Sequence, residues 1–217
     1  MRFVFLLLLL FITDFDRVSL APTQVTFSTL TKANYLQAKR NCIVTKPPIT
    51  FPIRKQNGRI IIQTAKGKKV FQDIVINEAA IKKGHGEEES TIYTYLGYLS
   101  DFHCHLINAG YYEIEEWLLI TDSGQQLELW GEPLFSPDLH YIAASCAGIE
   151  YSGGQPNIIQ LIALQEGNLR KVWSLEPKEW EPYQICWTSS NTLLLSRTMW
   201  TGKNPGTAYS YSKLFIN

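Results

Sequence analysis

The chain lacks an excess of charge of either sign, and it also lacks the sequence motifs of common enzymes. Twenty Lys and Arg residues balance twenty Asp and Glu residues among 217 in total, so the overall charge does not indicate nucleic acid or a membrane surface as a partner. The patterns G-x-S-x-G, H-E-x-x-H, G-x-G-x-x-G and C-x-x-C do not occur. Nucleophilic hydrolysis, zinc peptidase chemistry and dinucleotide binding therefore have no recognisable signal in the chain.

Long apolar runs are also missing, apart from one at the N-terminus. Residues 3–12 are apolar and follow Met1-Arg2. The run has the dimensions of a signal-peptide core and is shorter than the roughly 20 residues that a transmembrane helix needs. We predict a signal peptide over residues 1–21, ending at Ala21, and a secreted or periplasmic protein without a membrane span. Pro22 is unfavourable after a cleavage site, so an uncleaved leader or another site stays open.

Cysteine is scarce, and the spacing of the four cysteines resembles no metal-binding motif. They are Cys42, Cys104, Cys146 and Cys186. In an oxidising compartment an even number of cysteines indicates up to two disulfides, with three possible connectivities. We favour a Cys146–Cys186 bond, because both residues lie in strand-like apolar segments of the same half of the chain. The alternative is that some of the cysteines are small buried apolar residues.

Short apolar segments separated by Gly, Pro, Asn and Ser predict one all-β domain of antiparallel sheets over residues 22–217. Six Trp, eleven Tyr and ten Phe residues supply a core and exclude disorder. The only helix that we expect is a short one within residues 29–40. The expected strands are 59–63, 70–76, 92–99, 102–107, 111–120, 125–130, 141–146, 158–164, 169–175, 183–187 and 193–197. A propeller, a barrel and a β-sandwich all fit this spacing.

Charge is distributed unevenly along the domain. Residues 22–70 contain ten Lys and Arg residues and no Asp or Glu, whereas residues 71–217 contain eight basic and eighteen acidic residues. The segment 22–90 is thus a basic N-terminal part with a predicted hairpin around Lys66, Lys68 and Lys69, and 91–217 is an aromatic-rich part. The basic segment is either an arm for an anionic partner or a complement to the acidic half within one fold.

A weak repeat connects residues 130–145 with residues 180–196. In both copies an aromatic residue precedes a turn of small polar residues and then an apolar strand that ends in Ser, and Phe135 and Trp187 are 52 positions apart. Residues 133–143, with the sequence PLFSPDLHYIA, resemble the P-x-F-S-P-D-G-K-x-I-A core of WD-like β-propeller repeats in uncharacterised exported bacterial proteins.

This resemblance covers about residues 118–197, or roughly two blades. It implies propeller-like blades in the C-terminal half, in an open or incomplete propeller, and it implies no reaction. The sequence departs from the repeat at Leu139-His140, where the usual Gly-Lys provides a residue with positive φ for the turn.

His103 and His105 are the best candidates for metal ligands. If both belong to one strand they point to the same face, and two imidazoles on one face could chelate a metal ion. A zinc site needs further ligands, and His85, His140, Asp101 and Glu113 do not stand at a recognised spacing. A core or strand-edge position is the alternative for both histidines. We therefore expect no metal and no cofactor.

The function that we expect is an exported, non-catalytic binding module for a protein or glycan outside the cytoplasm. Flat amphipathic rings and cationic side chains are common anchors of binding surfaces. The alternatives are an inhibitor of a secreted hydrolase such as a lysozyme, and a metal-dependent hydrolase that uses His103 and His105. The predicted binding residues are Lys66, Lys68, Lys69, Tyr111, Tyr112, Trp130 and Trp200.

Overall fold

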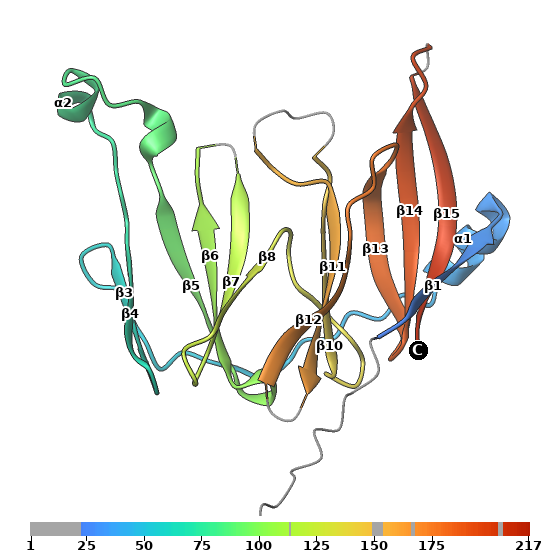
Figure 1. Ribbon diagram of the computed structural model, residues 1–217, viewed down its shortest axis with the longest axis horizontal. Coiled ribbons are helices and arrows are strands. Elements are labelled where there is room, and N and C mark those ends of the chain that lie inside the picture. The colour runs from blue at the N-terminus through green and yellow to red at the C-terminus, as the bar shows by residue number, and fades with distance from the viewer. Residues whose placement is uncertain (1–22, 113, 149–153, 166–167, 204–205) are drawn as a thin grey trace, which may run out of the picture.

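The computed structural model describes residues 23–112, 114–148, 154–165, 168–203 and 206–217, so the predicted signal peptide lies outside the described residues. These ranges form four antiparallel sheets, which stand side by side in Figure 1. The all-β prediction is confirmed. No helix within these ranges has the length and apolar character that crossing a bilayer requires.

Three of the sheets are built mainly from strands that follow one another along the chain. The β5–β8 sheet has the order β2 (Ile49–Thr50), β5 (Ile92–Leu99), β6 (Cys104–Gly110), β7 (Glu115–Thr121), β8 (Gln126–Leu129). The β9–β12 sheet contains β9 (Leu134–Phe135), β10 (Tyr141–Cys146), β11 (Ile158–Gln165) and β12 (Asn168–Leu175). The β13–β15 sheet contains β13 (Glu181–Ser189), β14 (Thr192–Trp200) and β15 (Thr207–Ile216), with β1 (Val25–Leu30) beside β15.

The fourth sheet is the hairpin of β3 (Arg59–Thr64) and β4 (Gly67–Gln72). The helical elements are short. They are α1 (Lys32–Lys39), α2 (Glu78–Ile81) and the 3₁₀ turns η1 (Glu87–Glu89) and η2 (Ser100–Phe102). Helix α1 confirms the short helix expected within residues 29–40.

Apolar side chains fill the space between each pair of neighbouring layers. Ile60 and Ile62 of the hairpin pack on Ile107 of β6, and Leu106 on the opposite face of β6 packs against the β9–β12 sheet. A third cluster joins the β9–β12 and β13–β15 sheets. A strand covered on both faces needs apolar residues at successive positions. This explains the continuous apolar runs of β6 and β11, which do not alternate with polar residues.

The two copies of the sequence repeat occupy equivalent places in successive sheets. Each copy contains the hairpin between the first two strands of its sheet, β9–β10 in one case and β13–β14 in the other. Leu139 has a φ of 58°, so the turn adopts the left-handed conformation that the repeat usually assigns to glycine. The wider expectation of propeller blades stays a prediction.

One disulfide is formed, and it differs from the expected one. Cys186 is bonded to Cys42, with 5.7 Å between the Cα atoms, while Cys146 and Cys104 are free. The predicted Cys146–Cys186 bond is therefore wrong. Cys186 lies on the face of β13 that points away from the β9–β12 sheet, and there the chain leaving α1 brings Cys42 against it.

Residues 43–50, which we call the crossing segment, contact the edge strands of three sheets. The Ile43 amide donates to the Trp187 carbonyl at 2.8 Å, Thr45 forms a bridge with Phe135 of β9, and β2 pairs with β5. Pro47 and Pro48 keep this part of the chain extended. The crossing segment, with the Cys42–Cys186 disulfide just before it and β2 at its end, thus connects the edges of the three sheets.

Candidate functional site

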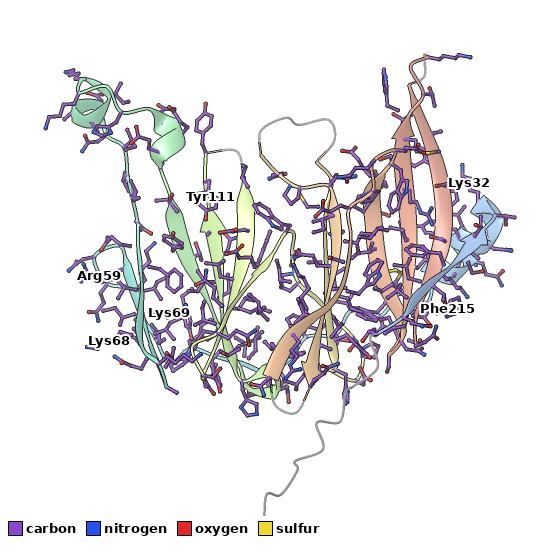
Figure 2. The ribbon with its side chains drawn as sticks, in the orientation of Figure 1. Lys32, Arg59, Lys68, Lys69, Tyr111 and Phe215 are labelled. Carbon is purple, nitrogen blue, oxygen red and sulfur yellow. A yellow bond between two sulfur atoms is a disulfide. The ribbon has the colours of Figure 1, made fainter. Side chains whose placement is uncertain are left out.

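The predicted lysines all lie on the β3–β4 hairpin, but they point in different directions. Lys66 is exposed in the turn and Lys68 is exposed on β4. Lys69 points toward the β5–β8 sheet, where its Nζ donates to Gln126 Oε1 at 3.4 Å. Figure 2 shows Lys68 and Lys69 on the hairpin, far from Lys32 on α1. Lys66 and Lys68 are thus available to a partner, whereas Lys69 also contacts the neighbouring sheet.

The predicted aromatic residues are not gathered into one site. Tyr111 and Tyr112 follow β6, Trp130 is half-buried after β8, and Trp200 ends β14 in another sheet. The Tyr111 hydroxyl donates to Glu116 Oε1 at 2.5 Å. Burial, followed by this hydrogen bond and the charge of Glu116, raises the pKa of Tyr111. Tyr111 therefore has a local structural role, and Trp200 belongs to a separate surface.

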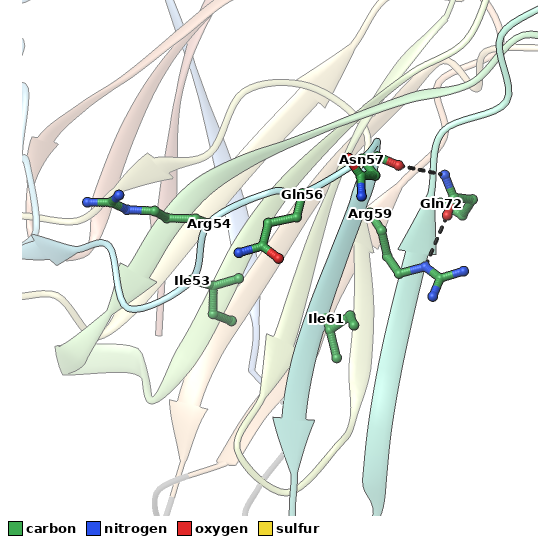
Figure 3. Close-up of a pocket in the computed structure, with 7 residues that line it drawn as sticks. All are labelled: Ile53, Arg54, Gln56, Asn57, Arg59, Ile61 and Gln72. Carbon is green, nitrogen blue, oxygen red and sulfur yellow. Dashed lines mark hydrogen bonds between the residues drawn. The ribbon is translucent and has the colours of Figure 1, made fainter.

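A concave site does exist beside the hairpin, and Figure 3 shows its side chains. It has a volume of about 530 Å³. Its lining consists of two arginines, three amide side chains and two isoleucines. These residues are Ile53, Arg54, Gln56, Asn57, Arg59, Ile61 and Gln72. We call this site the arginine pocket.

A tight turn brings the two sides of the arginine pocket together. Asn57 and Gly58 have φ values of 49° and 70°, and the amides of Gln56 and Arg59 donate to each other's carbonyls at 2.9 Å. Positive φ at both central residues defines the type I′ hairpin turn, which Asn-Gly favours. The turn places the segment that contains Arg54 and Gln56 antiparallel to the start of β3.

Hydrogen bonds across the hairpin hold one of the two guanidinium groups. Arg59 Nε donates to Gln72 Oε1 at 3.0 Å, and Gln72 Nε2 donates to the Asn57 carbonyl at 3.4 Å. Among the described residues, neither Arg54 nor Arg59 forms an ion pair. The terminal nitrogens of Arg59 and the whole Arg54 guanidinium can therefore donate to an anionic ligand, which planar guanidinium groups bind in a bidentate manner.

The neighbouring cation, Lys55, has an internal partner. Its Nζ lies 2.5 Å from Asp73 Oδ2 and donates to the Tyr93 carbonyl at 2.6 Å. Burial alone would raise the pKa of Asp73, but the hydrogen bonds from Lys55 and from the Tyr93 amide, with the charge of Lys55, lower it below its ordinary value. This ion pair fastens the segment before the turn to the β5–β8 sheet and leaves the arginine pocket without an acidic side chain.

The outer face of the hairpin continues the arginine pocket with apolar side chains. Ile60 and Ile62 point inward, so Arg59 and Ile61 point away from the sheets. Ile61 pairs with Val70 across the hairpin, and their exposed fractions are 40% and 52%. The surface thus has an apolar centre with Arg59 and Gln72 on one side and Lys68 on the other. We call this surface, with the arginine pocket, the hairpin face.

The two candidate metal ligands do not share a strand face. His103 is exposed and ends η2 in a left-handed conformation, with φ 48°, whereas β6 begins at Cys104. His105 is buried, and its Nδ1 lies 2.9 Å from the Tyr95 hydroxyl. The condition for a shared face, that both histidines belong to one strand, is therefore not met. Within the described parts of the chain, no three His, Cys, Asp or Glu side chains are grouped as metal ligands would be.

Comparison with known proteins found no matching family model, no matching curated protein and no matching solved structure. The resemblance to WD-like repeats stays a prediction from the sequence.

The sequence contained two signals for the arginine pocket. The Asn57-Gly58 pair is a strong signal for a tight hairpin turn, and Arg54 and Arg59 belong to the basic run of residues 22–70. The hairpin expected around Lys66 is present. The contribution of Gln72 could not be anticipated, because it depends on the cross-strand register that places Gln72 opposite Arg59.

Proposed function

We propose that the protein is an exported, non-catalytic binding module and that its hairpin face binds an acidic segment of another protein outside the cytoplasm. The observation that carries the proposal is the pair Arg54 and Arg59 in a concave site lined by amides and without an acidic side chain. Such a site offers hydrogen-bond donors to carboxylates and offers no charged acceptor to a cation.

An acidic protein segment fits the hairpin face better than a glycan does. Ile61 and Val70 form an apolar strip between the polar groups, and protein interfaces combine an apolar centre with a polar rim. A carboxylate-bearing peptide with apolar side chains would match both parts. A sulfated or carboxylated sugar would use the cationic groups and leave the apolar strip in water.

The location outside the cytoplasm is part of the proposal. The Cys42–Cys186 disulfide is compatible with an oxidising compartment, where such bonds persist. The apolar run of residues 3–12 has the composition of a signal-peptide core. We also propose that the fold is an open series of propeller-like blades. The β5–β8, β9–β12 and β13–β15 sheets, which follow one another along the chain, support this interpretation.

A defined probe tests the hairpin face. The mature protein is titrated with a peptide of alternating Glu and Leu residues at low and high salt, and binding is measured by calorimetry. We expect binding at low salt that weakens as salt rises, because surface charges are screened. The double variant Arg54→Glu/Arg59→Glu should abolish binding, whereas Arg54→Lys/Arg59→Lys should weaken it because the bidentate geometry is lost.

Lys32→Glu is the matched control. Lys32 is an exposed cation on α1, at the opposite end of the stack of sheets (Figure 2). The substitution Lys32→Glu makes the net charge more negative, as the double arginine variant does, but at a site far from the hairpin face. Equal loss of binding in Lys32→Glu and in the arginine variant would show a general charge effect and reject the site. Unchanged binding by the arginine variant would reject it as well.

A further inference from the structure

A second exposed surface lies at the far end of the β13–β15 sheet, and its chemistry differs from that of the hairpin face. Pairing of β13 with β14 ends at Glu181 and Thr198, whereas β14 and β15 continue together to Trp200 and Thr207. A groove of about 380 Å³ lies at this step, within the size range of small-ligand sites, about 300–1,000 Å³. We call it the aromatic groove.

Three aromatic rings of the groove are unusually exposed. The exposed fractions are 71% for Trp200, 58% for Tyr183 and 52% for Tyr209. Thr198 pairs with Tyr209, and Trp200 is two positions beyond Thr198, so Trp200 and Tyr209 project from the same face of the sheet. The rings of Tyr183 and Tyr209 meet edge to face, with 5.7 Å between their centroids.

The exposure of these rings is local, because α1 packs on a neighbouring part of the same face. Tyr211, two residues after Tyr209 on β15, stacks on the buried Tyr35 of α1 with 4.4 Å between the ring centroids. Lys39 at the end of α1 donates to Gln184 at 2.6 Å. The helix thus covers Tyr211 and reaches the side chain next to Tyr183, while the groove rings stay exposed.

The position of Trp200 is constrained by the chain that follows it. A Cβ atom added to Gly206 would overlap the six-membered ring of the Trp200 indole. The backbone at Gly206 therefore lies directly against this ring. A ring that is already held in place loses little side-chain entropy when a ligand stacks on it.

We propose that the aromatic groove binds a neutral oligosaccharide of pyranose units. The faces of pyranose rings carry C–H groups that stack on aromatic rings, and amphipathic rings such as Trp and Tyr provide this contact with little loss of side-chain freedom. Thr198 and Thr207 also line the groove, and each pairs across the sheet with one of the aromatic residues, Thr198 with Tyr209 and Thr207 with Trp200. Their hydroxyl groups can donate and accept hydrogen bonds. The lining therefore combines stacking surfaces with partners for sugar hydroxyls.

The charges of the groove favour a neutral ligand over an anionic one. Its charged lining residues are Lys178, Glu179 and Glu181, and Lys178 Nζ lies 3.6 Å from Glu176 Oε2. Carboxylates accept hydrogen bonds from sugar hydroxyls but repel acidic sugars, phosphates and acidic peptides. The groove is therefore separate in ligand class from the hairpin face, and the inference does not depend on the function proposed for that face.

Binding of neutral β-1,4-linked oligosaccharides to the mature protein tests the proposal. Cellohexaose and the hexamer of N-acetylglucosamine serve as probes, with calorimetry and Trp fluorescence as readouts. We expect binding of at least one of them, insensitive to salt, with the dissociation constant raised by about tenfold or more in Trp200→Ala because one central ring can carry much of the binding energy. Trp200→Phe keeps a ring and should retain most of the affinity.

Two further variants separate the groove from the rest of the molecule. Gly206→Ala displaces the Trp200 ring without removing it and should weaken binding as Trp200→Ala does. Tyr112→Ala removes a comparably exposed ring outside the groove and should leave the dissociation constant unchanged. Circular dichroism and thermal unfolding of each variant show whether it is folded.

Three results would overturn the proposal. The first is the absence of binding of either hexasaccharide by the folded wild-type protein. The second is binding that Trp200→Ala, Tyr183→Ala and Tyr209→Ala leave unchanged. The third is binding of sulfated or carboxylated oligosaccharides only, lost in Arg54→Glu/Arg59→Glu, which would assign the sugar to the hairpin face. If the acidic peptide does not bind at the hairpin face but a hexasaccharide binds at the aromatic groove, the proposed function is rejected and this inference is retained.

Discussion

The turn between β9 and β10 shows how a few polar side chains stabilise a tight connection. Ser136 is fully buried. Its Oγ donates to Asp138 Oδ1 at 2.7 Å and accepts from the Tyr141 amide at 2.9 Å. These bonds hold Leu139 in the left-handed region, at a φ of 58°, where a non-glycine residue is strained. The side chain of Leu139 in turn packs against the core between the β5–β8 and β9–β12 sheets.

Ser136→Ala should lower the free energy of unfolding by about 1–3 kcal/mol, because the partly buried Tyr141 amide and the Asp138 carboxylate each lose a partner. Urea unfolding followed by fluorescence measures the change. Ser174→Ala, at an exposed position of β12, is the control and should change the free energy by less than about 0.5 kcal/mol. Equal effects at the two serines would show that the Ser136 hydrogen bonds contribute nothing specific.

His105 is a buried titratable group between the hairpin and the β5–β8 sheet. Its ring contacts those of Tyr95 and Tyr98, with 5.9 Å and 4.9 Å between the ring centroids. The Tyr98 hydroxyl donates to Asp122 at 2.9 Å. Burial lowers the pKa of His105, and the charge of Asp122 opposes this shift without cancelling it. Burial also raises the pKa of Tyr95 to about 12. The surroundings of His105 thus disfavour the charged form of its imidazole.

The stability of the protein should therefore fall as pH falls below about 6.5, the ordinary pKa of histidine. Below that pH the unfolded chain binds a proton at His105 that the folded protein does not bind, and the loss continues until the pH drops below the folded-state pKa. Urea unfolding at a series of pH values measures this slope. His105→Gln should reduce it, whereas His103→Gln, at an exposed position, should retain it. The same slope in wild type and His105→Gln would contradict the assignment.

The disulfide and the crossing segment act together, because Cys42 is the residue before Ile43. The bond joins residues 144 positions apart, and the crossing segment then contacts β13, β9 and β5 in turn. Breaking the bond would therefore release the chain from the outer face of the β13–β15 sheet and from the edges of its neighbours.

Cys42→Ser/Cys186→Ser should lower the free energy of unfolding by about 2–5 kcal/mol, the usual cost of removing a native disulfide. Reduction of the wild-type protein should give a similar loss. Chemical denaturation with and without a reductant measures both. Cys146→Ser, at a free and half-buried cysteine, is the control for loss of a thiol. A denaturation midpoint that is the same for oxidised and reduced wild type would contradict the prediction.

The local sequence pattern correctly predicted strands that are mainly apolar, and it missed strands in which polar and apolar residues are mixed. Residues 141–146 were expected as a strand and match β10, and the apolar run of β11 was also correctly located. Strand β15 was missed because Ala, Ser and Lys alternate with its aromatic residues and because it follows a loop rich in Gly, Pro and Asn. Strand β1 was missed for a similar reason, since its only large apolar side chains are separated by Thr and Ser.

The candidate sites differ in the same way: a site formed by residues close in sequence could be predicted, and a site formed by distant segments could not. The basic hairpin followed from charge and turn residues that are close in sequence. The aromatic groove combines β13, β14 and β15, and no local pattern indicates that Tyr183 and Tyr209 lie next to each other. The pairing of Cys42 with Cys186 has the same origin, because it depends on the path that α1 takes across the outer face of the β13–β15 sheet. Contacts between distant segments are set by tertiary packing, which a single sequence does not display.

Polar contacts between the layers add specificity to the apolar packing. Gln160 of β11 accepts from the Trp130 amide at 2.8 Å and donates to the Glu128 carbonyl at 3.1 Å, which joins it to the edge of the β5–β8 sheet. The Trp187 indole donates to the Leu134 carbonyl at 2.9 Å and joins the β13–β15 sheet to β9. Both side chains are buried, so each hydrogen bond also satisfies a group that would otherwise be costly to bury.

The order of the layers predicts how the molecule opens. The β9–β12 sheet packs against a sheet on each face, whereas the two-stranded hairpin packs on one face only and exposes the other. Local opening requires least free energy where the fewest apolar contacts are lost, and a two-stranded hairpin is marginally stable without packing. Hydrogen exchange measured by mass spectrometry should therefore show the amides of β11 exchanging last and those of β3 and β4 exchanging well before them.

Ile60→Ala, which removes a hairpin contact, should accelerate exchange in β3 and β4 and leave β11 almost unchanged. Equal protection of β4 and β11 in the wild type, or acceleration of both by Ile60→Ala, would mean instead that the layers open as one cooperative unit.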